Sequence, residues 1–142
     1  MEYRFLGRSG LQISAISLGG WLTSGGGVDP EATFAGMKAA YDCGINFFDC
    51  AESYAAGESE RVMGEAIRKF GWKRKGLVVS TKIYWGSAFG EIKVNNVGLS
   101  RKHVIEGMNM SLERLKLDYV DLVYAHRPDR HTPMERCEPS TT

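Results

Sequence analysis

Short runs of β-branched and aromatic residues alternate along this chain with longer stretches in which apolar residues recur at helical spacing. The short runs cover residues 16–18, 45–48, 77–81 and 119–124, and the helical stretches cover residues 34–41, 62–70 and 104–115. Runs of four to eight residues suit buried strands, and recurrence at i, i+3, i+4 and i+7 suits helices. We therefore predict four strands that alternate with three helices.

Helix boundaries are marked by capping residues. Asp29 followed by Pro30 predicts the start of the first helix, and Gly44 predicts its end. Ser59 and Ser100 are the predicted caps of the second and third helices. The buried side of the third helix is predicted to carry Val104, Ile105, Met108, Leu112 and Leu115.

Ahead of this alternation, residues 3–6 and 11–14 read as two short extended runs joined by Gly7-Arg8-Ser9-Gly10. Glycine at both corners of the turn accommodates a positive φ, so these runs predict a β-hairpin.

Strands that alternate with helices imply a parallel sheet with right-handed crossovers, either doubly wound or closed into a barrel. A doubly wound nucleotide-binding sheet usually carries G-x-G-x-x-G after its first strand, and neither Gly19-Gly20-Trp21 nor residues 25–27 fit that spacing. The predicted fold is therefore α/β, of the parallel (β/α)8 TIM-barrel type. It is truncated to about the first four βα units after an N-terminal β-hairpin.

Composition narrows the function classes. With 43% hydrophobic and 25% charged residues and a formal net charge of +1, the chain reads as an ordinary soluble protein without a nucleic-acid partner. The basic residues 73–75 read as a solvated turn, and no apolar stretch reaches the roughly 20 residues that span a bilayer. Cys43, Cys50 and Cys137 lack metal-ligand or disulfide spacing, which predicts no metal site and a reducing, cytoplasmic location.

Three predicted strands end in ionisable residues. Asp49, Lys82 and His126 close successive strands, and Tyr54 lies five residues beyond Asp49. In a (β/α) barrel the carboxyl ends of the strands form the active site, so we expect these four side chains to gather at one rim. We call them the tetrad.

The tetrad residues suit acid–base chemistry at a carbonyl. A lysine ammonium beside a phenol favours the phenolate, an aspartate keeps the lysine charged, and a histidine can hydrogen-bond a carbonyl oxygen. Such a set can protonate a developing alkoxide, while a nicotinamide must supply the hydride. Taken singly, each residue also has a structural interpretation as a turn residue, a solvated charge, a loop histidine or an interface aromatic. Together, their strand-end positions favour catalysis.

At these positions the sequence resembles the aldo-keto reductase superfamily. Residues 49–60 (DCAESYAAGESE) resemble the D-x-A-x-x-Y-x-x-G-x-S-E signature, and residues 80–82 (STK) match a strand end of that family. The similarity runs from about residue 3 to residue 135 and is greatest to the β-subunits of voltage-gated potassium channels and their fungal and bacterial relatives. Residues 3–11, 81–86, 98–103, 127–129 and 132–135 support it.

The resemblance implies a catalytic role for the tetrad, with Tyr54 as the proton donor, and NADP(H) as the cofactor. It implies cofactor contacts from Gly20, Trp21, Asp49 and His126. Trp85, with Tyr54, would line the pocket of a small carbonyl substrate. Core packing is the alternative interpretation of Trp21 and Trp85.

Channel β-subunits usually carry asparagine where this chain has His126, which favours an active reductase. After Glu135 the family would continue with four more strands, which supply most contacts to the cofactor's phosphates. We therefore expect residues 1–135 to form the N-terminal half of the barrel and residues 136–142 a disordered tail. Two alternatives stay open: a regulatory, redox-sensing protein that binds a membrane channel, and a truncated product without function. A homo-oligomer is compatible with both the reductase and the regulatory protein.

Overall fold

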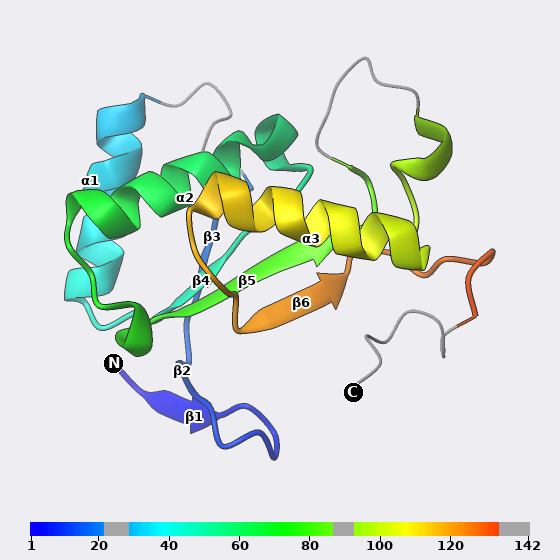
Figure 1. Ribbon diagram of the computed structural model, residues 1–142. Helices are drawn as coiled ribbons and strands as arrows, with labels where there is room; N and C mark the ends of the chain where they lie inside the picture. Colours follow the sequence, from blue (N-terminus) through cyan, green and yellow to red (C-terminus); the bar gives the residue numbers. More distant parts are fainter. Residues whose placement is uncertain (22–28, 87–92, 134–142) are drawn as a thin grey trace.

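The computed structural model describes residues 1–21, 29–86 and 93–133 (Figure 1). A hairpin comes first and a regular alternation of strands and helices follows. The strands are β1 (Tyr3–Phe5), β2 (Gln12–Ser14), β3 (Leu18–Gly19), β4 (Phe47–Asp49), β5 (Val78–Ile83) and β6 (Leu122–Ala125). The helices are α1 (Pro30–Asp42), α2 (Glu58–Lys69) and α3 (Arg101–Leu115), with short 3₁₀ turns η1 (Tyr54–Gly57), η2 (Arg74–Gly76) and η3 (Lys93–Asn95). The predicted alternation is therefore confirmed.

The N-terminal hairpin forms as predicted. Strands β1 and β2 pair antiparallel, with Tyr3 opposite Ser14. The connecting turn places Gly7 at φ +55° and Gly10 at φ +76°, conformations that cost glycine little because it has no Cβ. The hairpin lies outside the main sheet, beyond the amino ends of its strands (Figure 1).

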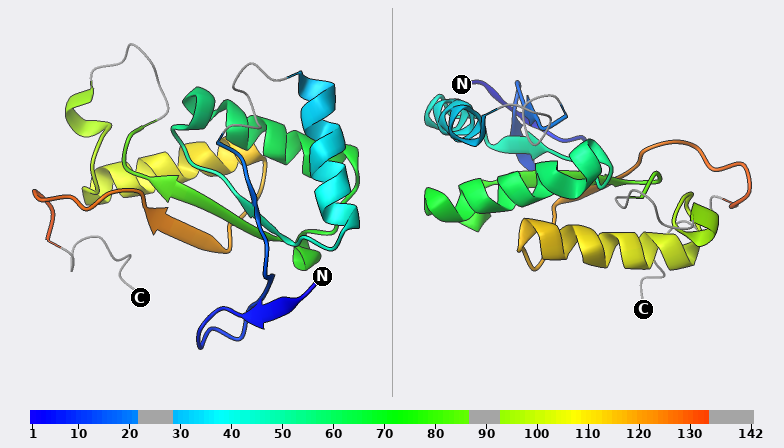
Figure 2. Two further views of the ribbon diagram at one scale, coloured as in Figure 1. Left: turned by 180° about the vertical axis from the view of Figure 1, so that it is seen from behind. Right: turned by 90° about the horizontal axis from the view of Figure 1, so that it is seen from above.

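The main sheet is parallel, and its strand order β3-β4-β5-β6 follows the order of the chain. A doubly wound sheet needs a reversal of strand order, and this sheet has none. Right-handed crossovers that always step in one direction place their helices on the same face, and Figure 2 shows α2 and α3 side by side there. Over the described residues the fold is α/β and the sheet stays open, because four strands do not close a barrel that requires eight.

Two of the three predicted helix starts are confirmed. Asp29 caps α1, accepting a hydrogen bond from the backbone N–H of Ala32, and the helix ends before Gly44 at φ +91°. Ser100 caps α3, with its hydroxyl oxygen 3.2 Å from the N–H of His103. Each cap satisfies an N–H group that has no partner within the helix.

The predicted cap of the second helix was wrong. Helix α2 begins at Glu58, after Gly57 at φ +89°, and Ser59 lies inside its first turn. The chain is already left-handed at Ala55 and Ala56, so the helix starts earlier than the apolar pattern indicates. The Ser59 hydroxyl instead donates to the carbonyl of Gly20 over 3.0 Å, which ties α2 to the end of β3.

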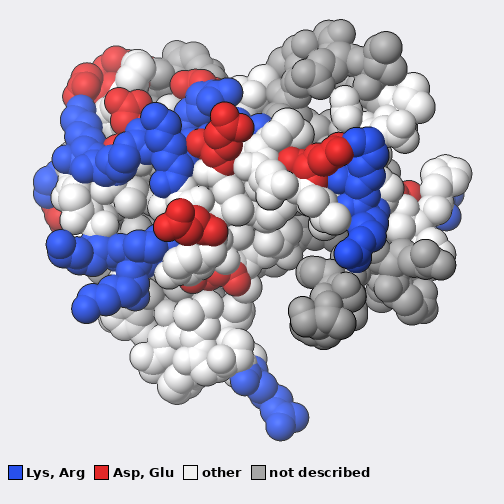
Figure 3. All heavy atoms as spheres, in the orientation of Figure 1, with Lys and Arg blue, Asp and Glu red and all other residues white. Residues whose placement is uncertain are grey.

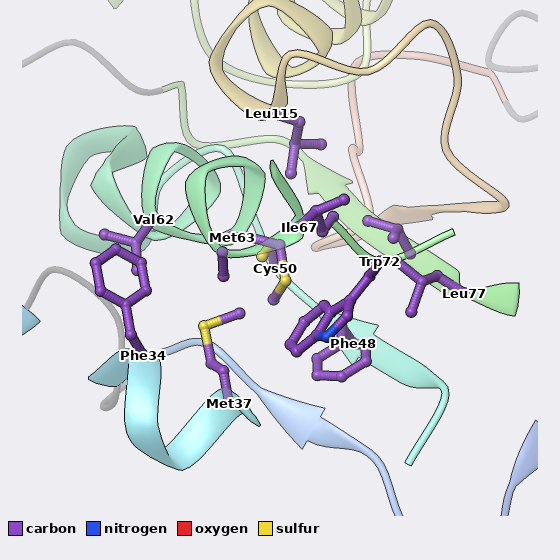
Figure 4. Packing of buried hydrophobic residues seen from close by; sticks show 12 residues of the cluster. Phe34, Met37, Phe48, Cys50, Val62, Met63, Ile67, Trp72, Leu77 and Leu115 are labelled. Atoms are coloured by element: carbon purple, nitrogen blue, oxygen red, sulfur yellow. The ribbon is translucent and has the colours of Figure 1, made fainter. Parts of the chain in front are cut away.

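The hydrophobic core lies between the sheet and helices α1 and α2 (Figure 4). Trp72 stacks on Tyr41 and Phe48, with ring centroids 4.3 and 5.5 Å apart. Other members include Phe34, Met37, Cys50, Val62, Met63, Ile67, Leu77, Val79 and Leu115. Burial of each large side chain contributes about 2 kcal/mol, so this cluster stabilises the strands β4 and β5 and the three helices that it joins.

Helix α3 buries the predicted side only in part, and its most buried residues are mainly polar. Its buried residues are His103, Gly107, Ser111, Arg114 and Leu115, whereas Ile105 is 48% exposed. Among the predicted residues, Leu115 alone is fully buried, and Val104, Met108 and Leu112 are half-buried. The buried side can be polar because His103 and Arg114 meet carboxylates of the loop after β4 and of α2, namely Glu52 and Glu60.

The basic turn at residues 73–75 is less solvated than predicted. The Arg74 side chain donates to Asp121 over 2.7 Å and lies 3.9 Å over the ring of Tyr119. It thereby joins the turn before β5 to the turn before β6. On the face drawn in Figure 3, basic and acidic side chains lie next to one another over the helices. Within the described ranges no helix is both long and apolar enough to cross a bilayer.

Candidate active site

The carboxyl ends of β4, β5 and β6 bring the tetrad residues to one edge of the sheet. Asp49 is the last residue of β4, Lys82 is the penultimate residue of β5, and His126 directly follows β6. The parallel register pairs Asp49 with Ser80. Because side chains alternate between the two faces of a strand, Asp49, Ser80 and Lys82 project from the face opposite the helices.

Lys82 is the centre of this group. Its Nζ donates to Asp49 Oδ2 over 2.5 Å, to the carbonyl of Cys50 over 2.8 Å and to the hydroxyl oxygen of Tyr54 over 3.0 Å. An ammonium has three protons, so these bonds use all of them and fix its position. Burial lowers the pKa of Lys82, but its contacts with Asp49 and Tyr54 raise it more, and the net pKa lies above its ordinary value. Lys82 therefore stays charged at neutral pH.

Asp49 is oriented from both sides. Its Oδ1 accepts a hydrogen bond of 2.6 Å from the Ser80 hydroxyl, while its Oδ2 accepts from Lys82. Both oxygens retain lone pairs, since an ionised carboxylate has about four acceptor sites. Asp49 can therefore hold the lysine and still accept a hydrogen bond from a ligand hydroxyl.

Tyr54 is held by an unusual turn. It begins η1, in which Ala55 (φ 48°) and Ala56 (φ 56°) both adopt the left-handed conformation. This conformation costs a residue with a Cβ roughly 1–2 kcal/mol. The turn brings Tyr54 back over β5, so that its hydroxyl reaches Lys82. Strain of this kind is often found where a functional side chain must be held in place.

His126 packs against Tyr54. The two rings meet edge to face, with centroids 5.7 Å apart, and the His126 N–H donates to the Ile83 carbonyl over 3.1 Å. Its Nδ1 is buried and has no hydrogen-bond partner among the residues described. Burial lowers the pKa of His126, and the charges of Lys82 and Arg127 lower it further. At neutral pH the ring is therefore uncharged beside the phenol.

Trp21 lies beside Tyr54 and Trp85 lies two residues beyond the end of β5, and neither is part of the core. Trp21 is 65% exposed and its ring centroid is 6.3 Å from that of Tyr54. Trp85 is 46% exposed and packs edge to face on Tyr84 at 4.8 Å. Their exposure contradicts the core-packing interpretation and leaves both rings accessible to a ligand.

Gly20 directly follows β3 and lies beside Asp49. Its N–H donates to the Asp49 carbonyl over 2.8 Å, and a Cβ at this position would come within 2.4 Å of the Ser59 hydroxyl. A larger residue would therefore push α2 away from the end of β3.

Sequence reasoning missed two buried acids, Glu52 and Glu60. Glu52 pairs with His103, and Glu60 Oε2 accepts a 2.6 Å hydrogen bond from Arg114 Nε. One signal was present for Glu60, because Met63 and Ile67 follow it at i+3 and i+7 on the buried face of α2. No local signal distinguished Glu52 from a loop acid at the surface.

The cysteines and acids offer no other obvious chemistry. Burial raises the pKa of Cys50 to about 12, which makes it a poor nucleophile. Cys43 is exposed, and Cys137 falls outside the described residues. Within the part of the chain that the structure covers, no three His, Cys, Asp or Glu side chains gather in a way that could hold a metal ion. The expected tail at residues 136–142 also lies outside the described residues.

Three relatives are similar to this chain along nearly its whole length. A protein of Schizosaccharomyces pombe is 57% identical over 136 residues, which cover 95% of this chain and 39% of the relative. Proteins of Oryza sativa subsp. japonica and Arabidopsis thaliana are 51% and 49% identical over 135 residues, 95% of this chain and 40% of each relative. All three are named voltage-gated potassium channel subunit beta, and each name is qualified as provisional. The chain thus spans about two-fifths of the length of these relatives.

The sequence profile described as "Aldo/keto reductase family" matches residues 15–138. The match contains all four tetrad positions together with Gly20, Trp21 and Trp85. Since it covers most of the sequence, the resemblance drawn from the motifs is confirmed, and the chain belongs to the aldo/keto reductase family.

Proposed function

We propose that this chain carries the acid–base half of an NADP(H)-dependent carbonyl reductase, with Tyr54 as the general acid. The observation that carries the proposal is the Lys82 ammonium, which bridges the Asp49 carboxylate and the Tyr54 hydroxyl over 2.5 and 3.0 Å. Lys82 donates to the phenol oxygen, so the hydroxyl proton of Tyr54 is left for another acceptor. An aldehyde or ketone oxygen placed beside Tyr54 would receive that proton as negative charge develops on it.

The other tetrad residues support this step. Lys82 stabilises the phenolate that remains after the proton has left, because a positive charge stands 3.0 Å from the oxygen. A neutral His126 next to the Tyr54 ring can donate a hydrogen bond to the same carbonyl oxygen. Asp49 keeps Lys82 charged and in place.

The residues at this rim fit the nicotinamide end of NADP(H), which supplies the hydride when bound. The exposed Trp21 ring offers a flat surface beside Tyr54, the Gly20 backbone is hydrogen-bonded to Asp49, and Asp49 retains acceptor capacity for a ribose hydroxyl. The His126 ring packs on Tyr54, and its buried Nδ1 has no hydrogen-bond partner among the described residues. The open sheet would then be half of a (β/α)8 barrel. The relatives extend beyond the matched region, and a segment of that kind would hold the cofactor's phosphates.

The first test is an NADPH titration of the chain followed by tryptophan fluorescence, with steady-state reduction of a panel of aldehydes and ketones. Tyr54→Phe should reduce turnover by about 100-fold or more while NADPH binding stays unchanged, since general acids contribute roughly 10²–10⁴. Tyr119→Phe, which removes a hydroxyl from an exposed ring beside Arg74, is the control. Undiminished reduction by Tyr54→Phe would exclude Tyr54 as the acid.

A second candidate is a cytoplasmic regulatory subunit that binds a membrane channel and senses redox state through its cofactor. The names of the three relatives favour it. The two candidates differ in turnover: a reductase oxidises many equivalents of NADPH per chain, whereas a sensor oxidises about one and then stalls. His126→Asn, which introduces the residue expected in channel subunits, should move the chain toward the stalled behaviour. Sedimentation would show whether the chain forms the homo-oligomer that either role allows.

A further inference from the structure

Glu52, which lies between Asp49 and Tyr54 in the sequence, carries a buried carboxylate. Glu52 is 0% exposed, and its Oε1 accepts hydrogen bonds from the N–H groups of Tyr84 (2.7 Å) and Gly86 (2.8 Å). Burial raises the pKa of Glu52, but hydrogen bonds from His103, Tyr84 and Gly86 lower it more, and the net pKa lies below its ordinary value. A charged carboxylate in the interior is costly unless its partners compensate, so these bonds are needed for Glu52 to be charged there.

His103 completes the site from helix α3. Its Nε2 lies 3.3 Å from Glu52 Oε1, and a carboxylate can only accept, so Nε2 carries the proton. The other oxygen, Oε2, is buried without a hydrogen-bond partner among the described residues. A Cβ at Gly107 would come within 2.9 Å of Oε2, so the helix leaves room for the acid at this point.

The turn that Glu52 holds is the one that carries Trp85. Tyr84 and Gly86 flank Trp85, and both N–H groups point at one oxygen, an arrangement that a carboxylate accepts well. Gly86 adopts φ +74°, and the Tyr84 carbonyl accepts from Gly98 over 2.7 Å. The carboxylate therefore determines the path of the backbone on both sides of Trp85.

The tetrad is held by other bonds. Lys82 has its three contacts with Asp49, Cys50 and Tyr54, and the Glu52 side chain makes none of them. Glu52 is bonded to this group through its backbone N–H, which donates to the Lys82 carbonyl over 3.2 Å and is unaffected by a side-chain substitution, while the charge of its side chain raises the pKa of His126 against the larger lowering effects of burial and Lys82. Loss of the carboxylate would thus loosen Trp85 and leave the acid–base geometry in place.

We infer that Glu52 is a positioning residue that holds Trp85 against the substrate through the Tyr84 and Gly86 amides. The inference rests on the proposed function, in which Trp85 lines the pocket of the carbonyl substrate. It differs from a purely structural role, in which Glu52 would join α3 to the sheet without affecting substrate binding.

The structural test is amide hydrogen exchange by NMR on the 142-residue chain, comparing Glu52→Ala and Glu52→Gln with wild type. In Glu52→Ala the amides of Tyr84 and Gly86 should exchange about 10- to 100-fold faster, the effect of losing a hydrogen bond to a charged group. Glu52→Gln keeps a neutral acceptor and should retain part of the protection. Glu60→Gln, at another fully buried acid, is the matched control: it breaks the ion pair with Arg114 and lowers stability in general, but it should not deprotect the Tyr84 and Gly86 amides more than other amides of the chain.

The functional test is a double-mutant cycle with Trp85→Ala. Glu52→Ala should raise KM for the carbonyl substrate about 10-fold and change kcat less than about 3-fold, and it should add nothing in the Trp85→Ala background. Additive effects, a loss confined to kcat, or unchanged exchange at Tyr84 and Gly86 would each overturn the inference. A Glu52→Ala effect that is no more selective for the Tyr84 and Gly86 amides than that of Glu60→Gln would overturn it too, because the effect would then be general loosening. If wild type reduces no carbonyl, the proposed function fails, and with it the role toward substrate, while the exchange data still decide whether Glu52 holds the turn.

Discussion

Replacing Arg114 with methionine is expected to destabilise the chain strongly, because it leaves the Glu60 carboxylate buried without its cation. The side chains of Arg114 and Glu60 are 6% and 0% exposed, with 2.6 Å between Nε and Oε2. Glu60 also accepts a 2.5 Å hydrogen bond from the Thr81 hydroxyl. The pair therefore joins α2, α3 and β5, the elements around which the tetrad is assembled.

The size of the effect follows from the burial. Removal of one partner of a buried ion pair costs about 3–5 kcal/mol, because the remaining charge is desolvated and uncompensated. Single domains are stable by only about 5–15 kcal/mol, so Arg114→Met would remove about a fifth or more of the free energy of unfolding. For a domain of this size the melting temperature would fall by about 10 °C or more.

Urea unfolding followed by circular dichroism at 222 nm measures this loss. The double variant Glu60→Gln with Arg114→Met removes both charges and keeps an oxygen for Thr81, so it should be about 2 kcal/mol more stable than Arg114→Met alone. Lys102→Met breaks an exposed ion pair with Glu106 on the same helix and should cost less than about 1 kcal/mol. A loss below about 1 kcal/mol for Arg114→Met, or strict additivity in the double variant, would refute the reasoning.

Two further predictions concern the loop that follows β4. Ala56→Gly should raise the free energy of unfolding by about 0.5–1 kcal/mol, because relief at φ 56° outweighs the entropy cost of glycine, whereas Ala35→Gly inside α1 should lower it by about 1 kcal/mol. Equal losses in urea unfolding would argue against strain at η1. Because the pKa of Glu52 is lowered on folding, its contribution to stability is complete above its ordinary pKa of 4.5 and is lost as pH falls through the lower pKa of the folded state. Glu52→Gln should therefore flatten the acid limb of stability against pH, and an unchanged limb would contradict a charged Glu52.

The order of elements could be predicted because its causes are local. Apolar spacing within a few residues separates strand from helix, and a capping side chain such as Asp29 or Ser100 accepts from the N–H three residues further along. Left-handed glycines at turns are local as well. The one helix cap that was predicted wrongly, Ser59, follows Ala55 and Ala56, which adopt a left-handed conformation that alanine does not prefer.

The meeting of the tetrad residues could also be anticipated, although their catalytic roles stay predictions. Parallel strands place their carboxyl ends at one edge, so residues that end successive strands become neighbours wherever they lie in the sequence. The sequence did not predict whether the Trp21 and Trp85 side chains are buried or exposed, because exposure depends on what the rest of the fold covers.

The sequence by itself determined which segments form strands and helices and which ionisable residues stand at the strand ends. The tertiary structure alone decided which charges are buried: Glu52 meets His103 across 51 positions of the chain, and Glu60 meets Arg114 across 54. It also decided that α3 turns a polar side inward. The physical reason is that hydrophobic periodicity reports the cost of exposing apolar surface, whereas a buried charge is tolerated only when a distant partner arrives, and that partner leaves no local pattern.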